Sequence, residues 1–291
     1  MVSFSRPVSE LIRRRYSCRA YQTTPIPDDL QRRLAESIDT LGSGPFGSAA
    51  RFMLVAARDD DAKSLRGLGT YGFIKNAPGY LIGAGSPDPM ALVDFGYLFE
   101  ALILAATDLE LGTCWLGGTF TKSRFARKIE IGKGEIMPAA VSIGLADDEA
   151  RLRGELRLRM GMNRRLDFDR LFFDGGFDSP LDSTGAGEIG PALEAVRWAP
   201  SASNKQPWRV VRHRGDYHFY MQRTPHYGKG SLVFTLLRLA DLQRVDLGIA
   251  ICHFDLVVRE SGASGKWVVD DPGLGVGRDD TAPEYIATWR P

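Results

Sequence analysis

Two polar segments of this 291-residue chain have the residue types and spacing expected of a ligand site. The first reads RRRYSCRAY and alternates Arg15, Ser17 and Arg19. A planar guanidinium can bind phosphate through two parallel hydrogen bonds, and a serine hydroxyl adds a further donor. A solvated basic face on an N-terminal helix would produce the same run of charges. By itself, the segment therefore indicates either a phosphate site or an exposed helix face.

The second segment, WAPSASNKQPWRVV, runs from Trp198 to Val211. It combines two prolines, several small residues, an asparagine and a glutamine, and it ends in an apolar run. This composition predicts a shaped loop followed by a strand. The loop is suited either to touching a ligand or simply to turning the chain.

Composition narrows the class of protein. Hydrophobic residues make up 44% of the chain and charged residues 25%, and the net charge of +1 argues against a nucleic-acid partner. Three cysteines without a C-x-x-C pair, and histidines without ligand spacing, predict a reducing compartment and no metal site. The N-terminus lacks the apolar core of a signal peptide. Phe95 to Thr107 is too short to span a bilayer and is expected to be a buried helix. We therefore expect a cytoplasmic protein without membrane contact.

The chain contains two similar segments. VDFGYLFEALILAATDLELGTCW begins at Val93, and VDLGIAICHFDLVVRESGASGKW begins at Val245, an offset of 152 residues. Each begins V-D-x-G and ends in tryptophan after the same number of residues, which favours a duplicated unit. The segment LGSGPFGSAARFMLV, from Leu41, occupies in the first copy the place that WAPSASNKQPWRVV occupies in the second, but it has lost most of the polar loop residues. We expect two halves, residues 1–174 and 175–291, joined within the Gly-, Asp- and Ser-rich stretch 172–188.

Local patterns predict the elements of both halves. Helices are expected at 30–41 and 192–198, and strands at 52–57, 80–84, 139–145 and 208–212. Asp94 and Asp246 stand near the starts of the long helical stretches and are expected to cap them. Trp115 and Trp208 are expected to pack in the core. Alternating helices and short strands predict an α+β fold.

Four motifs together resemble the nitroreductase family of flavoproteins. RYSCRAY, from Arg15, fits R-x-S-x-R-x-[FY] and resembles the opening motif of the family, and APSASNKQPW, from Ala199, is similar to its second signature. LGTCWLGG, from Leu111, and NRRLDFDRLFF, from Asn163, resemble its third signature and its basic closing segment. In ordinary members the A-P-S segment follows the opening motif by some tens of residues, whereas here it lies in the second copy.

The resemblance implies how the site is built. In the family, each FMN lies at a dimer interface, with arginines from one subunit and the A-P-S loop from its partner. This chain is therefore similar to a single-chain branch, with a nitroreductase-like fold, two homologous halves in a pseudo-twofold unit and no need of a second copy. One FMN site survives, and its mirror site has decayed. The implied FMN-binding residues are Arg15, Ser17, Arg19, Gly117, Gly118, Arg164, Arg165, Pro200, Ser201, Ser203 and Asn204.

Each group of residues has an implied role. The arginines and Ser17 would bind the phosphate, and the N–H groups of Gly117 and Gly118 would face the flavin, where glycine allows close approach and a positive φ. The A-P-S loop would border the flavin ring or the ribityl chain. Gln206 stays outside this set.

The resemblance implies an FMN-dependent oxidoreductase that takes electrons from NADH or NADPH and reduces a small acceptor such as a nitroaromatic compound or a quinone. One alternative is a non-catalytic flavin-binding protein that acts as carrier or sensor. Another is a dinucleotide-binding dehydrogenase, suggested only by the G-x-G-x-x-G of Gly67, Gly69 and Gly72, which has no clear strand before it.

Overall fold

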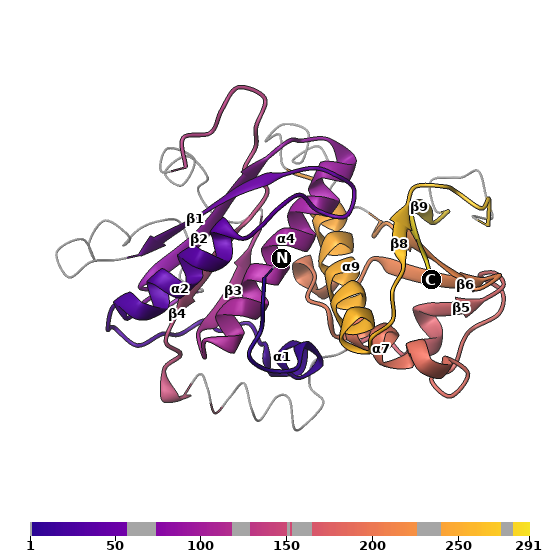
Figure 1. Ribbon diagram of the computed structural model, residues 1–291, viewed down its shortest axis with the longest axis horizontal. Helices are drawn as coiled ribbons and strands as arrows, with labels where there is room; N and C mark the ends of the chain where they lie inside the picture. The colour runs from indigo at the N-terminus through magenta and orange to yellow at the C-terminus, as the bar shows by residue number, and fades with distance from the viewer. Residues whose placement is uncertain are drawn as a thin grey trace.

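The structure, a computed structural model, places two β-sheets on either side of a central pair of helices (Figure 1). It describes residues 2–56, 74–117, 129–149, 152, 165–225, 240–274 and 282–291. In that part of the chain, one sheet is built from first-half strands, and the other is built mainly from second-half strands. This arrangement confirms the expected α+β class.

The first sheet, as far as the structure describes it, has four strands in the order β1-β2-β4-β3. They are β1 (Ala50–Ala56), β2 (Gly79–Gly85), β4 (Ala140–Gly144) and β3 (Gly112–Leu116). All neighbouring strands are antiparallel. The two middle strands are buried along their whole length, which fits their small and β-branched residues. The structure confirms the strands predicted from sequence here and adds β3, whose residues were recognised only as part of a motif.

The second sheet has five strands over the described residues, in the order β5-β6-β7-β9-β8. They are β5 (Phe172–Asp174), β6 (Trp208–His213), β7 (Asp216–Met221), β9 (Glu284–Arg290) and β8 (Lys266–Val268). β5 pairs in parallel with β6, and the other pairs are antiparallel. β5 ends the segment 1–174, yet it lies in the sheet of the segment that follows. Its main-chain hydrogen bonds therefore tie the two segments together.

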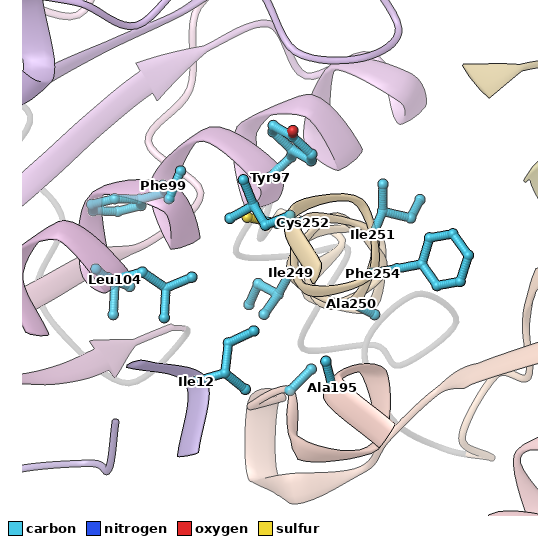
Figure 2. Packing of buried hydrophobic residues seen from close by; sticks show 14 of the residues in the cluster. Ile12, Tyr97, Phe99, Leu104, Ala195, Ile249, Ala250, Ile251, Cys252 and Phe254 are labelled. Carbon is cyan, nitrogen blue, oxygen red and sulfur yellow. The ribbon is translucent and has the colours of Figure 1, made fainter. Parts of the chain in front are cut away.

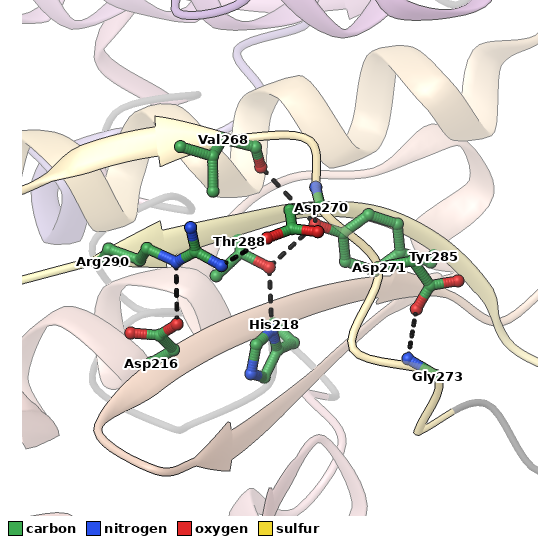
Figure 3. A network of polar contacts seen from close by, with 9 residues as sticks. All are labelled: Asp216, His218, Val268, Asp270, Asp271, Gly273, Tyr285, Thr288 and Arg290. Atoms are coloured by element: carbon green, nitrogen blue, oxygen red, sulfur yellow. Dashed lines mark hydrogen bonds and ion pairs between the residues drawn. The ribbon is translucent and has the colours of Figure 1, made fainter.

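Polar contacts hold β9 against its neighbours (Figure 3). The ring of the buried His218 lies 2.7 Å from the hydroxyl of Thr288, which in turn lies 2.8 Å from the hydroxyl of Tyr285. Arg290 Nε donates to Asp216 at 2.9 Å. Burial lowers the pKa of His218, so this imidazole is neutral at neutral pH. These contacts therefore stabilise the pairing of β7 with β9.

The central helices are α4 (Pro89–Asp108) and α9 (Leu242–Glu260). Almost every residue of both is buried, because they pack on each other and on elements all around them. Figure 2 shows Ile249 and Cys252 of α9 on the side that faces α4. Among the described residues, α4 alone has the length and hydropathy to cross a membrane, but 94% of its apolar window is buried inside the protein. Its hydrophobicity is thus explained by its place in the core.

The two central helices cross at a pair of glycines. A Cβ on Gly96 would clash with the carbonyl oxygen of Val245, and a Cβ on Gly248 would clash with the carbonyl oxygen of Val93. Glycine is required at both positions because the opposing atom is part of a main chain. The contacts are reciprocal at the repeat offset of 152 residues.

Shorter helices surround this pair. α1 (Val8–Arg14) packs on α4, α9 and α7 (Gly190–Trp198), while α2 (Asp28–Asp39) packs on β1 and α4. α1 buries Val8, Leu11 and Ile12 and ends at Arg14, one residue before Arg15 of the opening motif. Single 3-10 turns form at Phe168–Arg170 (η1), Gly187–Ile189 (η2) and Ala202–Asn204 (η3). Both predicted short helices, in α2 and α7, are confirmed.

Candidate functional site

The loop that follows α7 has a strained backbone. Ser203, Asn204 and Gln206 have φ angles of 52°, 55° and 50°, in the left-handed region that most side chains avoid. The Ser201 hydroxyl accepts the Gln206 N–H at 2.9 Å, and the Gln206 side chain accepts the N–H of Leu166 at 2.9 Å. Such residues cost about 1–3 kcal/mol each and cluster at binding sites. Gln206 therefore stabilises the conformation of the loop through these two hydrogen bonds. The loop itself is a candidate binding element.

A buried aspartate on each central helix anchors a loop. Asp246 Oδ1 accepts the N–H of Ala202 at 3.0 Å, and Asp94 accepts those of Phe46 at 2.9 Å and Ser48 at 2.7 Å. The predicted capping role of both aspartates is wrong, because each helix begins about one turn earlier. The loop after Trp198 and the corresponding loop after Leu41 are thus each held by main-chain N–H groups that donate to a helix aspartate, as a duplicated unit would require.

Arg15 is a buried cation with unpaired donors. It follows α1 in extended conformation and is only 8% exposed. Its Nε lies 3.8 Å from Glu100 Oε1, which is an ion pair but not a hydrogen bond. Nε and Nη1 find no hydrogen-bond acceptor within the described ranges. Because an unpaired buried donor is costly, and more so when charged, this arrangement calls for an anionic ligand.

Arg165 joins Arg15 from a distant segment. Its Nη1 donates to Asn204 Oδ1, and its Nη2 donates to the carbonyl of Trp198, both at 2.8 Å. Its buried Nε has no acceptor in the part of the chain that the structure covers. Burial lowers the pKa of Arg165 to about 10, and the positive charges of Arg15 and Arg197 contribute to that fall. The guanidiniums of Arg15 and Arg165 are thus close enough to repel each other.

Ser17 and Arg19 meet at Cys114 of β3. Ser17 forms a parallel β-bridge with Thr113, and the side chains of Ser17 and Arg19 lie close enough to the Cys114 thiol to lower its pKa. Burial raises the pKa of Cys114, while Arg19 and Arg15 partly oppose that rise. The alternating residues of the opening motif therefore gather around one point of the first sheet, with Arg19 exposed.

Two further residues near the arginines belong to none of the four sequence motifs. Glu100 of α4 and His253 of α9 are both fully buried, and His253 Nε2 lies 3.0 Å from Glu100 Oε1. Trp115 Nε1 donates to Glu100 Oε2 at 2.8 Å, so this tryptophan packs against the core as predicted and also serves the site. The charged residue inside the apolar helix was the available signal for Glu100. No sequence pattern distinguished His253.

Gly117, directly after β3, has no positive φ, contrary to the expectation for it. A Cβ there would lie 2.9 Å from Leu242 Cδ1 at the start of α9, a side-chain end that can move aside. Pro200 is half-buried at the start of the strained loop, and Trp208 is fully buried as predicted. The expected residues Gly118 and Arg164 lie outside the described residues, as do the glycines of the G-x-G-x-x-G pattern, Gly67, Gly69 and Gly72.

The gathered side chains form a cationic site. Arg15 and Arg165 lie near the carboxylate of Glu100, Arg19 lies near Cys114, and Asn204 and Ser17 add polar groups. Buried guanidiniums with free N–H groups suit a compact dianion such as a phosphate monoester. The first sheet, the central helices and the loop after α7 all contribute, so the site is composite.

Comparison with known proteins agrees with this architecture. The family model described as "Putative TM nitroreductase" matches residues 7–258. The crystal structure of a "putative nitroreductase" from Thermotoga maritima superposes with a TM-score of 0.61 at 18% identity, over 99% of this chain and 95% of that one. A nitroreductase with bound FMN from Desulfitobacterium hafniense matches 50% of this chain and 91% of its own, with a TM-score of 0.41 and 22% identity.

An FMN-dependent nitroreductase from Clostridium difficile matches 47% of this chain and 87% of its own, with a TM-score of 0.40 and 19% identity. The search of curated proteins found no relative. The family model spans most of the sequence, and the Thermotoga structure has the same overall fold from end to end. The chain therefore belongs to the nitroreductase family that this model describes.

Proposed function

We propose that this chain binds FMN at the composite site and is an FMN-dependent oxidoreductase. It takes electrons from NADH or NADPH and passes them to a small acceptor such as a nitroaromatic compound or a quinone. The observation that carries the proposal is the meeting of Arg15 and Arg165, two buried arginines with unpaired donors, beside Asn204. The phosphate of FMN is close to a dianion at neutral pH and is suited by several charged donors. Membership of the nitroreductase family supports the same cofactor.

Each part of the site has a proposed task. The phosphate would be held by Arg15, Ser17, Arg19, Arg164 and Arg165. The N–H groups of Gly117 and Gly118 would serve the flavin edge, and Pro200, Ser201, Ser203 and Asn204 would border the ring or the ribityl chain. Bound FMN would supply the hydride-transfer chemistry. The side chains of this chain bind and orient, and none is assigned as acid or base.

The same proposal includes an internal duplication, with halves at 1–174 and 175–291. It is supported by the reciprocal contacts of Gly96 and Gly248 and by the matching roles of Asp94 and Asp246. Because fused halves already supply the interface of a homodimer, we propose a cytoplasmic monomer. Light scattering that gives a dimer mass would contradict the monomer.

The test starts with the visible spectrum of the purified protein after addition of FMN and removal of the excess. The same sample then receives NADH or NADPH under nitrogen, and loss of the flavin absorbance reports reduction and the preferred donor. Failure to retain or titrate FMN would refute the proposal. Retained flavin that neither nucleotide bleaches would indicate the non-catalytic carrier or sensor instead.

A matched pair of variants locates the site. Arg15→Gln should weaken FMN binding about 10- to 100-fold, the usual effect of losing a charge-assisted hydrogen bond. Arg13→Gln removes the same charge from an exposed position of α1 and should leave FMN affinity nearly unchanged. Equal effects in both variants would mean that only the overall charge matters.

A further inference from the structure

Three donors face the carboxylate of Glu100, which is fully buried between the central helices. Trp115 Nε1 donates to Oε2 at 2.8 Å. Oε1 lies 3.0 Å from His253 Nε2 but 3.8 Å from Arg15 Nε. The histidine of the second half, and not the arginine of the first, therefore makes the hydrogen bond to Oε1.

The geometry around His253 defines where its protons lie. Nδ1 is 2.9 Å from the carbonyl oxygen of Ala195, which can only accept, so Nδ1 carries a proton. Nε2 faces the Glu100 carboxylate, which also accepts from Trp115 and has Arg15 nearby. With both ring nitrogens facing acceptors, the geometry suits an imidazolium, which can donate from both. An imidazolium here would form with Glu100 a buried ion pair without net charge.

The pairing has a consequence for Arg15. Without a cationic partner on α9, Glu100 would be a buried carboxylate whose nearest cation is the guanidinium of Arg15. A small rotation would bring that guanidinium into hydrogen-bond contact with the carboxylate, because leaving a buried charge uncompensated is very costly. With His253 in place, Nε and Nη1 of Arg15 stay unpaired.

We infer that His253 is a positioning residue that keeps the Arg15 guanidinium available for the ligand phosphate by occupying the Glu100 carboxylate. This inference rests on the proposed FMN function. In this arrangement, His253 of the second half determines whether the charge of Arg15 in the first half is available to a ligand. A separate monomeric half would lack this control, since α4 and α9 belong to different halves.

The remaining groups around the pair are consistent with a dianionic ligand. Cys252 lies on α9 next to His253, and burial, with a smaller contribution from Glu100, raises the pKa of its thiol, which is therefore neutral. Arg165 is close to Glu100 and remains charged at neutral pH. The ion pair contributes no net charge, and Arg15 and Arg165 contribute one positive charge each. Together they favour an anionic ligand such as a phosphate monoester.

The experiment compares FMN with riboflavin, which differs only in lacking the phosphate. Dissociation constants of both are measured by flavin fluorescence for the wild type, His253→Gln, Glu100→Gln and the double variant. At mildly alkaline pH, His253→Gln should reduce the preference for FMN about 10- to 100-fold, with riboflavin affinity little changed. Glu100→Gln and the double variant should keep the preference of the wild type within about threefold.

A merely structural role predicts a different pattern, in which the double variant is at least as weak as His253→Gln. That result, or an unchanged preference in His253→Gln, would overturn the inference. A wild type that binds neither flavin would instead remove the proposed function. Tyr97→Phe is the matched control, since it deletes a 2.6 Å hydrogen bond to Asp255, a buried carboxylate on α9 whose partners lie outside the arginine cluster. It should leave the FMN preference unchanged.

A second measurement needs no variant that could fail to fold. The ¹⁵N chemical shifts of His253 in the wild type should show both ring nitrogens protonated at neutral pH. A neutral imidazole would contradict the ion pair and the inference with it.

Discussion

Gly96 and Gly248 set the separation of the central helices, so Gly96→Ala or Gly248→Ala should destabilise the protein strongly. A Cβ at either position would lie less than 3.0 Å from the main-chain oxygen of Val245 or Val93. A main-chain oxygen cannot rotate away as the end of a side chain can. The helices must therefore move apart.

The size of the effect follows from that movement. An ordinary contact between carbon and a carbonyl oxygen is about 3.3–3.6 Å, so the Cβ and the opposing oxygen must separate by more than about 1 Å further. Even a gap of roughly 0.5–1 Å forfeits a quarter to a half of the dispersion attraction between facing atoms. We take this loss as roughly 0.5 kcal/mol for each side chain that faces the other helix, which gives roughly 4 kcal/mol over the whole crossing. The better helix propensity of alanine returns about 1 kcal/mol. We expect a net loss of about 3 kcal/mol in the free energy of unfolding.

Urea denaturation measures this loss. Gly190→Ala is the control, because a Cβ in this first turn of α7 would lie at an ordinary 3.5 Å from its nearest neighbour, and its free energy of unfolding should change by less than about 1 kcal/mol. One widening relieves both clashes, so the double variant Gly96→Ala/Gly248→Ala should cost little more than the worse single variant. Stability of Gly96→Ala equal to that of the control, or full additivity in the double variant, would refute the reasoning.

Three other outcomes are expected. Burial raises the pKa of Asp246 well above its ordinary value, so the folded state binds the proton more tightly than the unfolded state. The free energy of unfolding of the wild type then falls as pH rises from the pKa of Asp246 in the unfolded state towards its pKa in the folded state. Asp246→Asn should lack that fall in thermal melts. Parallel plots of melting temperature against pH for the two proteins would contradict this. Ser203→Val should lose about 1–2 kcal/mol relative to Ser203→Gly in urea denaturation, because φ is 52° at this position; equal stabilities would mean that the loop relaxes. The three cysteine thiols are buried with raised pKa values and should react with a disulfide reagent only after denaturation; rapid reaction in the folded protein would refute their burial.

Much of the fold could be predicted because its signals are local. The apolar stretch around Phe95 predicts a buried helix whatever it packs against, and period-two patterns with turn residues predict the strands of the first sheet. The repeat offset was also readable in sequence, since Gly96 and Gly248 stand at equivalent positions of the two similar segments. Their mutual contact was not readable, because it depends on how two distant helices cross.

The sequence by itself determined which elements form and which motif residues are candidates for binding. Only the tertiary structure decided that Arg15 and Arg165 lie together with unpaired donors, and that Glu100 pairs with His253. It also decided that β5 joins the second sheet. The physical reason is that local periodicity reports the environment of a residue, buried or exposed, but not the identity of its distant partner. Charge compensation in a core depends on that identity, so the electrostatics of the site is set only when distant segments of the chain pack together.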